Sequence, residues 1–385
     1  MSSLKKILAL FLAAIMVISL AACSAVPISL NKEWSYKSDS QEYPVGMYIF
    51  CLYSAYRQAY STLSENLGDK FDSTASILDL SSTFDETNTV YLCKDWIKSE
   101  ADKICRNLVA LDMEIEKYGI TLDPEIVESA RNQAKDDWYL GPYYEYSADY
   151  STAYKDLMEP YGISFESYFL GSVNLAKVKQ SALFNYFYNK GGVKEVPESE
   201  IKAYFEKEYT SYSYFTANFF TSTRDESGTT TTIPFSKDKE EDMKKTLTNY
   251  CVMLEEGESF ENVAKEYMKY AGLEEDPTIS NTEILSSTAL PDEVAKVLKD
   301  LPEGKSKVVL TGTEKSQLAY LLYKAPIKDA TEEYLKVDTN YTQILTKLKG
   351  DEFVDYMLKI TDDVKCQVNQ SYIDKCDPKM FESNL

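Results

Sequence analysis

The sequence predicts a multidomain, mainly α protein, in which a helical domain is followed by a small α/β domain. Glycine and proline are few, 14 and 12 among 385 residues, which argues against a β-sandwich or a glycine-looped α/β enzyme. Apolar residues recur at helical spacing before residue 197, and a strand-like, aromatic run begins at residue 212. The chain is longer than one typical domain, so separate cores are expected.

The amino terminus has the pattern of an export signal. Two lysines precede an apolar stretch at residues 7–20, which is too short to span a bilayer comfortably. The run LAAC, residues 20–23, resembles a bacterial lipobox, in which the cysteine becomes the first residue of the mature protein and carries a diacylglycerol. We therefore expect a signal peptide at 1–22 and a tether at 23–43, with Cys23 anchoring the chain at the outer face of the cell membrane. The alternative is an ordinary secretory signal with an incidental cysteine.

Residues 44–197 read as an all-helical domain. The apolar stripe from Ile97 to Ile115 advances in steps of four and three residues and stops before Gly119, as in a long amphipathic helix with a glycine at its C-terminal end. Asp123 and Pro124 suit the N-cap and the first position of the next helix. Helices are predicted at about 44–63, at 90–118, from 124 onward and at 164–189, and a linker helix is predicted at 198–211.

Residues 212–327 read as the α/β domain. The run YSYFTANFFT, residues 212–221, alternates in the manner of a strand that is packed on one side. One face carries Phe215, Ala217 and Phe219, and the more polar, open face carries Tyr214, Thr216, Asn218 and Phe220. A threonine-rich loop, two helices, a short strand near 283–286, a third helix and two strands are predicted to follow. The tail, 328–385, is predicted to be helical and to pack on the helical domain.

Composition excludes several classes of function. The chain has no histidine, which removes Ser-His and Cys-His nucleophile systems and histidine-containing metal sites. A net charge of −21 opposes binding to phosphate backbones, so no nucleic-acid partner is expected. No CxxC pair or phosphate-binding glycine loop occurs, and we expect no metal and no cofactor. The six cysteines besides Cys23 are predicted to be buried free thiols, with Cys366 and Cys376 as the only local pair that could bridge.

Tyrosines are concentrated in the stretch WYLGPYYEYSADYSTAY, residues 138–154. Aromatic side chains with a polar tip suit loose binding of extended peptide or of sugar, because they give contact area at little entropic cost. The alternative is that these rings pack loops onto helices. The candidate peptide-binding residues of this stretch are Tyr143, Tyr144, Tyr146 and Tyr150.

Several stretches, taken in order, resemble the PrsA/SurA-type extracytoplasmic foldases. They include YGITLDPEIVESA, VPESEIKAYFEKEY, LEEGESFENVAKEYM and LPDEVAKVLKDLPEGKSKVVL. Each is weakly specific alone, and their order and spacing carry the resemblance, which extends from about residue 90 to 360. The resemblance implies a helical chaperone domain, a parvulin-type prolyl isomerase domain and a C-terminal helix that returns to the first domain.

The parvulin site is carried over with substitutions at its polar positions. The histidine of the first strand corresponds to Asn218, the acid or thiol falls near Tyr270, and the second histidine falls on Ala319 or, with a one-residue slip, on Tyr320. A proline pocket would be built from Phe220, Leu290 and Val294. The resemblance therefore implies a degenerate module with no assigned catalytic residue and with weak or absent isomerase activity.

We expect a lipid-anchored extracytoplasmic chaperone whose partners are unfolded or partly folded secreted polypeptides. One alternative is an active peptidyl-prolyl isomerase. Another is a surface lipoprotein that binds glycan or a small solute, and a third is an adhesion protein with no preference for unfolded clients.

The LAAC run generates a prediction about anchoring. Cys23→Ala should leave an unlipidated precursor or a released protein, because only the thiol can accept the diacylglycerol. Cell fractionation and the mass of the amino-terminal peptide measure the outcome. Wild-type protein found free in the medium with an intact, unmodified Cys23 would contradict the anchor.

Overall fold

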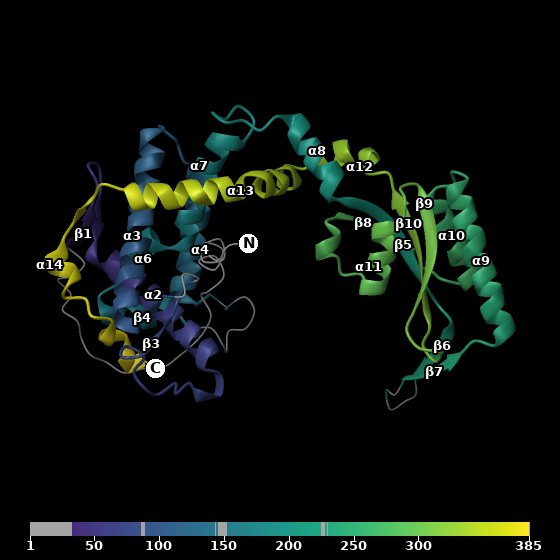
Figure 1. Ribbon diagram of the computed structural model, residues 1–385, viewed down its shortest axis with the longest axis horizontal. Coiled ribbons are helices and arrows are strands. Elements are labelled where there is room, and N and C mark those ends of the chain that lie inside the picture. The colour runs from purple at the N-terminus through teal and green to yellow at the C-terminus, as the bar shows by residue number, and fades with distance from the viewer. Residues whose placement is uncertain are drawn as a thin grey trace. The chain divides into compact units, whose positions relative to one another are not determined.

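The computed structural model describes residues 33–85, 89–142, 144, 152–224, 228 and 230–384. The predicted signal peptide and Cys23 lie outside the described residues. The chain is mainly α with small antiparallel sheets, which confirms the predicted fold class (Figure 1). It divides into two compact units: unit 1 comprises Met1–Glu195 with Lys349–Leu385, and unit 2 comprises Val196–Leu348.

Unit 1 is built on helices, with short strands at its margins. The longer helices are α2 (Val45–Leu67), α3 (Cys93–Lys117), α4 (Pro124–Tyr139), α7 (Val173–Tyr188) and the second part of α13 (Asp338–Asp363). Shorter helices are α5 (Tyr154–Met158), α6 (Phe165–Gly171) and α14 (Gln370–Ile373), with 3-10 turns η2 (Gly68–Lys70), η4 (Glu159–Tyr161) and η6 (Pro378–Asn384). Strands β1 (Trp34–Lys37), β2 (Glu42–Pro44) and β11 (Gln367–Val368) form one sheet, and β3 (Ser81–Thr83) pairs with β4 (Val90–Leu92).

The single helix predicted at 164–189 is two helices in the structure, α6 and α7. The break lies at Ser172, whose extended backbone caps α7 and whose hydroxyl accepts a hydrogen bond from the Leu175 amide. At the end of α6 a side chain on Gly171 would lie 2.7 Å from the Phe50 ring. The chain therefore turns where a glycine lets α6 approach α2.

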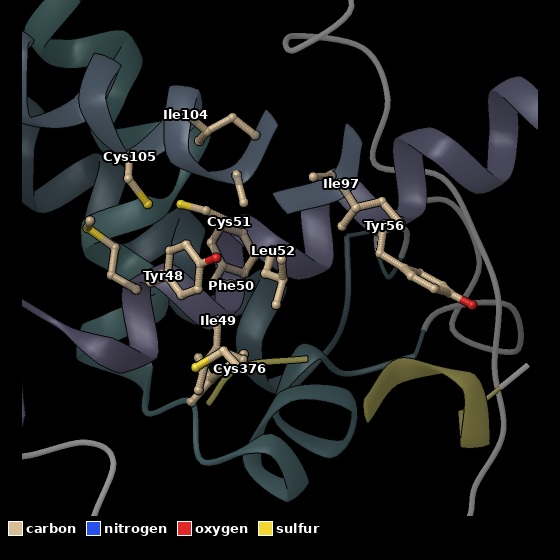
Figure 2. Packing of buried hydrophobic residues seen from close by; sticks show 14 of the residues in the cluster. Tyr48, Ile49, Phe50, Cys51, Leu52, Tyr56, Ile97, Ile104, Cys105 and Cys376 are labelled. Atoms are coloured by element: carbon tan, nitrogen blue, oxygen red, sulfur yellow. The ribbon is translucent and has the colours of Figure 1, made fainter. Parts of the chain in front are cut away.

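Helix α2 lies at the centre of the unit 1 core. Six consecutive residues, 47–52, are buried, which requires contacts all around the helix. Figure 2 shows labelled side chains of α2 and α3 packed together, among them Ile49, Leu52, Ile97 and Ile104. The core of unit 1 is thus organised around a helix with no solvent face over almost two turns.

Carboxylates on α3 are held by tyrosine hydroxyls from distant parts of the chain. Tyr36 donates to Asp102 Oδ1 at 2.6 Å, and Tyr43 donates to Asp112 Oδ2 at 2.8 Å. Tyr356 of α13 donates to Glu114 Oε2. In the same helix Phe353 packs on Phe184 of α7 with ring centroids 5.3 Å apart. Strands β1 and β2 and the second part of α13 are therefore all bound to α3.

Unit 2 contains a four-stranded antiparallel sheet in the order β8-β5-β10-β9. Its strands are β5 (Thr210–Asn218), β8 (Ile279–Glu283), β9 (Lys305–Thr311) and β10 (Leu318–Ala325). Its helices are α8 (Glu198–Glu208), α9 (Lys237–Glu255), α10 (Phe260–Ala271), α11 (Asp292–Asp300), α12 (Ile327–Leu335) and the first part of α13, with a 3-10 turn η5 (Leu285–Ser287). The strand predicted at 283–286 lies earlier in the chain, as β8.

The threonine-rich segment predicted as a loop is a β-hairpin, formed by β6 (Phe220–Arg224) and β7 (Thr230–Pro234). The first strand of the unit accordingly ends at Asn218. The Phe219 amide donates to the Gln317 carbonyl at 3.0 Å, and the Phe219 carbonyl accepts from the Phe235 amide at 2.9 Å. These two bonds fix the point where the chain leaves the sheet.

The two faces of the sheet have separate cores. Phe215, Ala217 and Ala319 pack against α9 and α10, where Phe215 stacks on Tyr267 with centroids 4.4 Å apart. On the opposite face Tyr212 and Leu322 pack against α11. Figure 1 shows α9 and α10 beside one face and α11 beside the other. The alternation predicted for residues 214–218 thus matches the two faces of β5, whereas Phe220, predicted on the open face, belongs to the β6–β7 hairpin.

Buried tyrosines predict loss of stability at alkaline pH. Burial raises the pKa of Tyr267 to about 12 and that of Tyr209 to about 12, whereas an unfolded tyrosine titrates near pH 10. Above about pH 10 the unfolded chain releases protons that the folded chain keeps, so stability is full below that pH and falls as pH rises. We expect the urea midpoint, followed by far-UV circular dichroism, to decrease between pH 9 and pH 11.

Two variants test the origin of this decrease. Tyr267→Phe should make the alkaline decrease smaller, because it removes a buried titrating phenol. Tyr139→Phe is the matched control, since that side chain is 57% exposed and should leave the decrease unchanged. Equal pH profiles for both variants and the wild type would contradict the assignment.

Candidate functional site

The face of the sheet that carries α11 continues beyond the helix. Along β5 this face presents Tyr212, Tyr214, Thr216 and Asn218 in turn, because alternate residues point the same way. The register with β10 sets Leu322 across from Tyr214, Tyr320 across from Thr216, and Leu318 across from Asn218. Directly opposed residues share a face, so these side chains form one surface.

Helix α11 covers only one end of this surface. Tyr212, Leu322 and Val309 contact a cluster that includes Leu290, Val294 and Leu298. Val294 and Leu298 have no exposed surface, and Leu290 is 8% exposed. These three side chains fill the space between α11 and the sheet. Farther along the strands, burial decreases from Tyr212 through half-buried Tyr214 and Thr216 to exposed Asn218.

Two half-buried tyrosines, Tyr214 and Tyr320, lie at the edge of the α11 cluster and pack against it. The rings of Tyr214 and Tyr320 lie 5.6 Å apart, centroid to centroid, with 36° between their planes. Tyr212 stacks on Tyr214 at 6.2 Å and donates its own hydroxyl to Glu283 Oε1 at 2.5 Å. Within the described chain the hydroxyls of Tyr214 and Tyr320 have no hydrogen-bond partner. They are therefore free to bond a ligand.

The protonation of Tyr214 is set by its surroundings. Burial raises the pKa of Tyr214, and the neighbouring Tyr320 and Glu283 raise it further. The Tyr214 hydroxyl therefore keeps its proton at neutral pH and can donate as well as accept a hydrogen bond. The surface formed by Tyr214, Thr216, Asn218, Leu318 and Tyr320 carries no formal charge.

Asn218 is the last residue of β5 and its side chain is exposed. Among the residues that the structure describes, no hydrogen bond involves the side-chain amide of Asn218. Tyr320 shares this face with it, whereas Ala319 is fully buried on the side of α9 and α10. The resemblance to the parvulin site left Ala319 and Tyr320 as alternatives for the position of its second histidine. Of these two residues, only Tyr320 lies on the same face of the sheet as Asn218.

Of the other predicted site residues of unit 2, Tyr270 and Phe220 lie apart from this surface, whereas Leu290 and Val294 lie in the α11 cluster against which Tyr214 and Tyr320 pack. Tyr270 is on α10, behind the opposite face of the sheet, and its hydroxyl donates to Asp242 Oδ2 of α9 at 2.7 Å. Phe220 belongs to the β6–β7 hairpin, where it pairs with Pro234. Leu290 and Val294 belong to the α11 core. The structure therefore brings together Asn218 and Tyr320 and does not bring Tyr270 or Phe220 to them.

Most of the tyrosine-rich stretch falls outside the described residues, including Tyr143, Tyr146 and Tyr150. Tyr144 is described, belongs to unit 1 and is 49% exposed. Nearby, Trp138 is buried against Tyr168, with ring centroids 5.3 Å apart, while Tyr139 is exposed. The described part of this stretch thus combines a packing residue with exposed rings.

In the described ranges no group of three acidic, cysteine or histidine side chains is placed to hold a metal ion. None of the helices in those ranges is long and apolar enough to cross a membrane.

Tyr214 was placed on the open face by alternation but was not predicted as a site residue. The missing information was the register between β5 and β10, two strands about a hundred residues apart in the sequence. The sequence contains a signal for this register. Each strand has a buried alanine on one face, Ala217 or Ala319, and a tyrosine on the other face, Tyr214 or Tyr320.

Comparison with known proteins gives a distant structural similarity. No protein-family model and no curated protein sequence matches the chain. The foldase protein PrsA from Streptococcus pneumoniae is similar at 17% identity over 80% of this chain and 100% of that chain, with a TM-score of 0.34. PrsA from Bacillus subtilis is similar at 15% identity over 88% of this chain and 95% of that chain, with a TM-score of 0.24.

Proposed function

We propose that this protein is a lipid-anchored, extracytoplasmic folding factor that binds unfolded or partly folded secreted polypeptides and has weak or absent prolyl isomerase activity. The observation that carries the proposal is the Tyr214–Tyr320 pair, whose hydroxyls have no partner in the described chain, on a sheet face that α11 leaves partly open. The lipobox-like run at residues 20–23 supports the location.

The chemistry of this face suits an extended, uncharged peptide segment. The two rings offer apolar area with little loss of side-chain entropy, and their hydroxyls can bond backbone carbonyls. Thr216 and the Asn218 amide add hydrogen-bonding groups that both donate and accept. Because these contacts use the peptide backbone and apolar side chains, they would select for unfolded chain rather than for one sequence.

The same residues explain why catalysis would be weak. Rotation about a peptide bond has a barrier of about 18–20 kcal/mol, and lowering it requires groups held against the twisted amide. Tyr214, Thr216, Asn218 and Tyr320 carry only hydroxyl and amide groups, and the chain has no histidine. Binding on this face therefore needs only exposed apolar and hydrogen-bonding surface. Efficient isomerisation needs a polar network that these residues do not form.

Active prolyl isomerisation is the second candidate. One observation favours it: Asn218 and Tyr320 share a face and stand where the resembling family carries its histidines. Amide and phenol groups could stabilise a twisted amide by hydrogen bonds without proton transfer.

The first functional prediction concerns holding. Wild-type protein should suppress the aggregation of reduced, denatured lysozyme, followed by light scattering. Tyr214→Ala combined with Tyr320→Ala should weaken suppression; a loss of about 1.4 kcal/mol would raise the concentration needed roughly tenfold. Tyr270→Ala is the matched control, because it removes a tyrosine from α10 on the opposite side of the sheet. Suppression that is equal in all three proteins would exclude this face as the binding surface.

The second functional prediction concerns catalysis. In a protease-coupled assay on a proline-containing peptide, the wild-type protein should stay within about twofold of the uncatalysed rate. Asn218→Ala should change neither this rate nor the suppression of aggregation. A parvulin-like rate that disappears in Asn218→Ala would make Asn218 a catalytic residue and would favour the second candidate.

A further inference from the structure

Two buried thiols meet where α2 packs on α3. Cys51 of α2 is 1% exposed and Cys105 of α3 has no exposed surface. Figure 2 shows the two sulfur atoms turned toward each other at the contact between the two helices. All six cysteines outside the signal region are free thiols in this structure. We propose that Cys51 and Cys105 form a disulfide bond that ties α2 to α3 when the chain folds in an oxidising compartment.

The interface around the two thiols is narrow. Ala55 and Ala59 continue the face of Cys51 at four-residue steps along α2, and Ala101 precedes Cys105 by four residues on α3. All three alanines have no exposed surface. Small side chains let two helix backbones approach closely, as a disulfide requires, because its Cα atoms must lie about 4.4–6.8 Å apart. Because the two sulfur atoms already face each other across this interface, we expect bond formation to need little movement of either helix.

The reaction is a thiol–disulfide exchange that consumes one oxidant disulfide. The thiolate of one cysteine attacks a sulfur of a low-mass or protein disulfide, forming a mixed disulfide and releasing one thiol. The second cysteine, after losing its proton, attacks the mixed disulfide, forms the Cys51–Cys105 bond and releases the second thiol. The pair loses two electrons and two protons, and the oxidant disulfide gains them as two thiols.

Burial decides when this exchange can occur. Removal from water raises the pKa of Cys105, and contact with Cys51 raises it further, so the attacking thiolate is scarce in the folded protein. Exchange is therefore favoured before the α2–α3 core closes. Once made, the bond is shielded from reductants by the same side chains. Its presence would record the redox conditions during folding rather than those met afterwards.

The test uses the full chain carrying Cys23→Ser, which retains six thiols. The protein is unfolded in urea with reductant and refolded in a buffer of reduced and oxidised glutathione. Free thiols are blocked with N-ethylmaleimide, and the protein is digested without reduction for mass spectrometry. We expect two of the six thiols to escape blocking, a cross-linked peptide that joins Cys51 to Cys105, and a urea midpoint that falls on reduction.

Variants separate this pair from the other thiols. Cys51→Ala should keep all its remaining thiols free and lose the change in urea midpoint. Cys93→Ala, a control in the same helix as Cys105, should still form the bond and keep that change. Peptide mapping of the wild type decides the matter even if Cys51→Ala folds poorly. Six free thiols after oxidative refolding, or a bond from Cys366 to Cys105 or Cys376, would overturn the proposal.

Discussion

The hydrogen bonds between tyrosine hydroxyls and the carboxylates of α3 hold the organisation of unit 1 in place. Each of the three carboxylates also pairs with a cation: Asp102 with Arg106 at 2.8 Å, Asp112 with Lys179, and Glu114 with Lys117 at 2.9 Å. The phenols of Tyr36, Tyr43 and Tyr356 bond the same carboxylates without adding charge, and they join α3 to distant segments. These tyrosines come from β1, β2 and α13, elements at opposite ends of the sequence. One acidic helix thus fixes where β1, β2 and the second part of α13 lie within this unit.

In unit 2 the side chains of β5 alternate, so that one face of the strand packs in the core and the other carries the proposed binding residues. Phe215 and Ala217 of β5 are committed to the α9 and α10 core, while Tyr214, Thr216 and Asn218 of the same strand face the other way. Because α11 buries only the end of that second face, the sheet is stabilised on both sides and still leaves aromatic surface exposed. The site we propose is therefore a part of the sheet that α11 covers only in part.

Local patterns predicted much of this fold and little of the site. The stripe from Ile97 to Ile115 and the alternation after residue 212 correspond to real elements, because each pattern depends on neighbours within one helix or strand. The break at Ser172 and the β6–β7 hairpin were missed, since they depend on the approach of Gly171 to Phe50 and on the pairing of Phe219. The Tyr214–Tyr320 contact depends on register between distant strands. A slip of one residue there exchanges Ala319 for Tyr320 and reverses the face.

The β6–β7 hairpin is a practical place to attach a spectroscopic probe to the protein. Every residue of the two strands except Phe220 is exposed, and the Phe219 amide bonds the Gln317 carbonyl where the ribbon leaves the sheet. A fluorophore attached through a cysteine introduced in place of Thr223 or Thr231 would displace no core side chain. These two residues lie opposite each other in the hairpin. Because the chain supplies no histidine, a pair introduced across these strands would also form a unique chelation point for a paramagnetic ion. Spectroscopic distances measured from that point could follow unit 2 while a client binds.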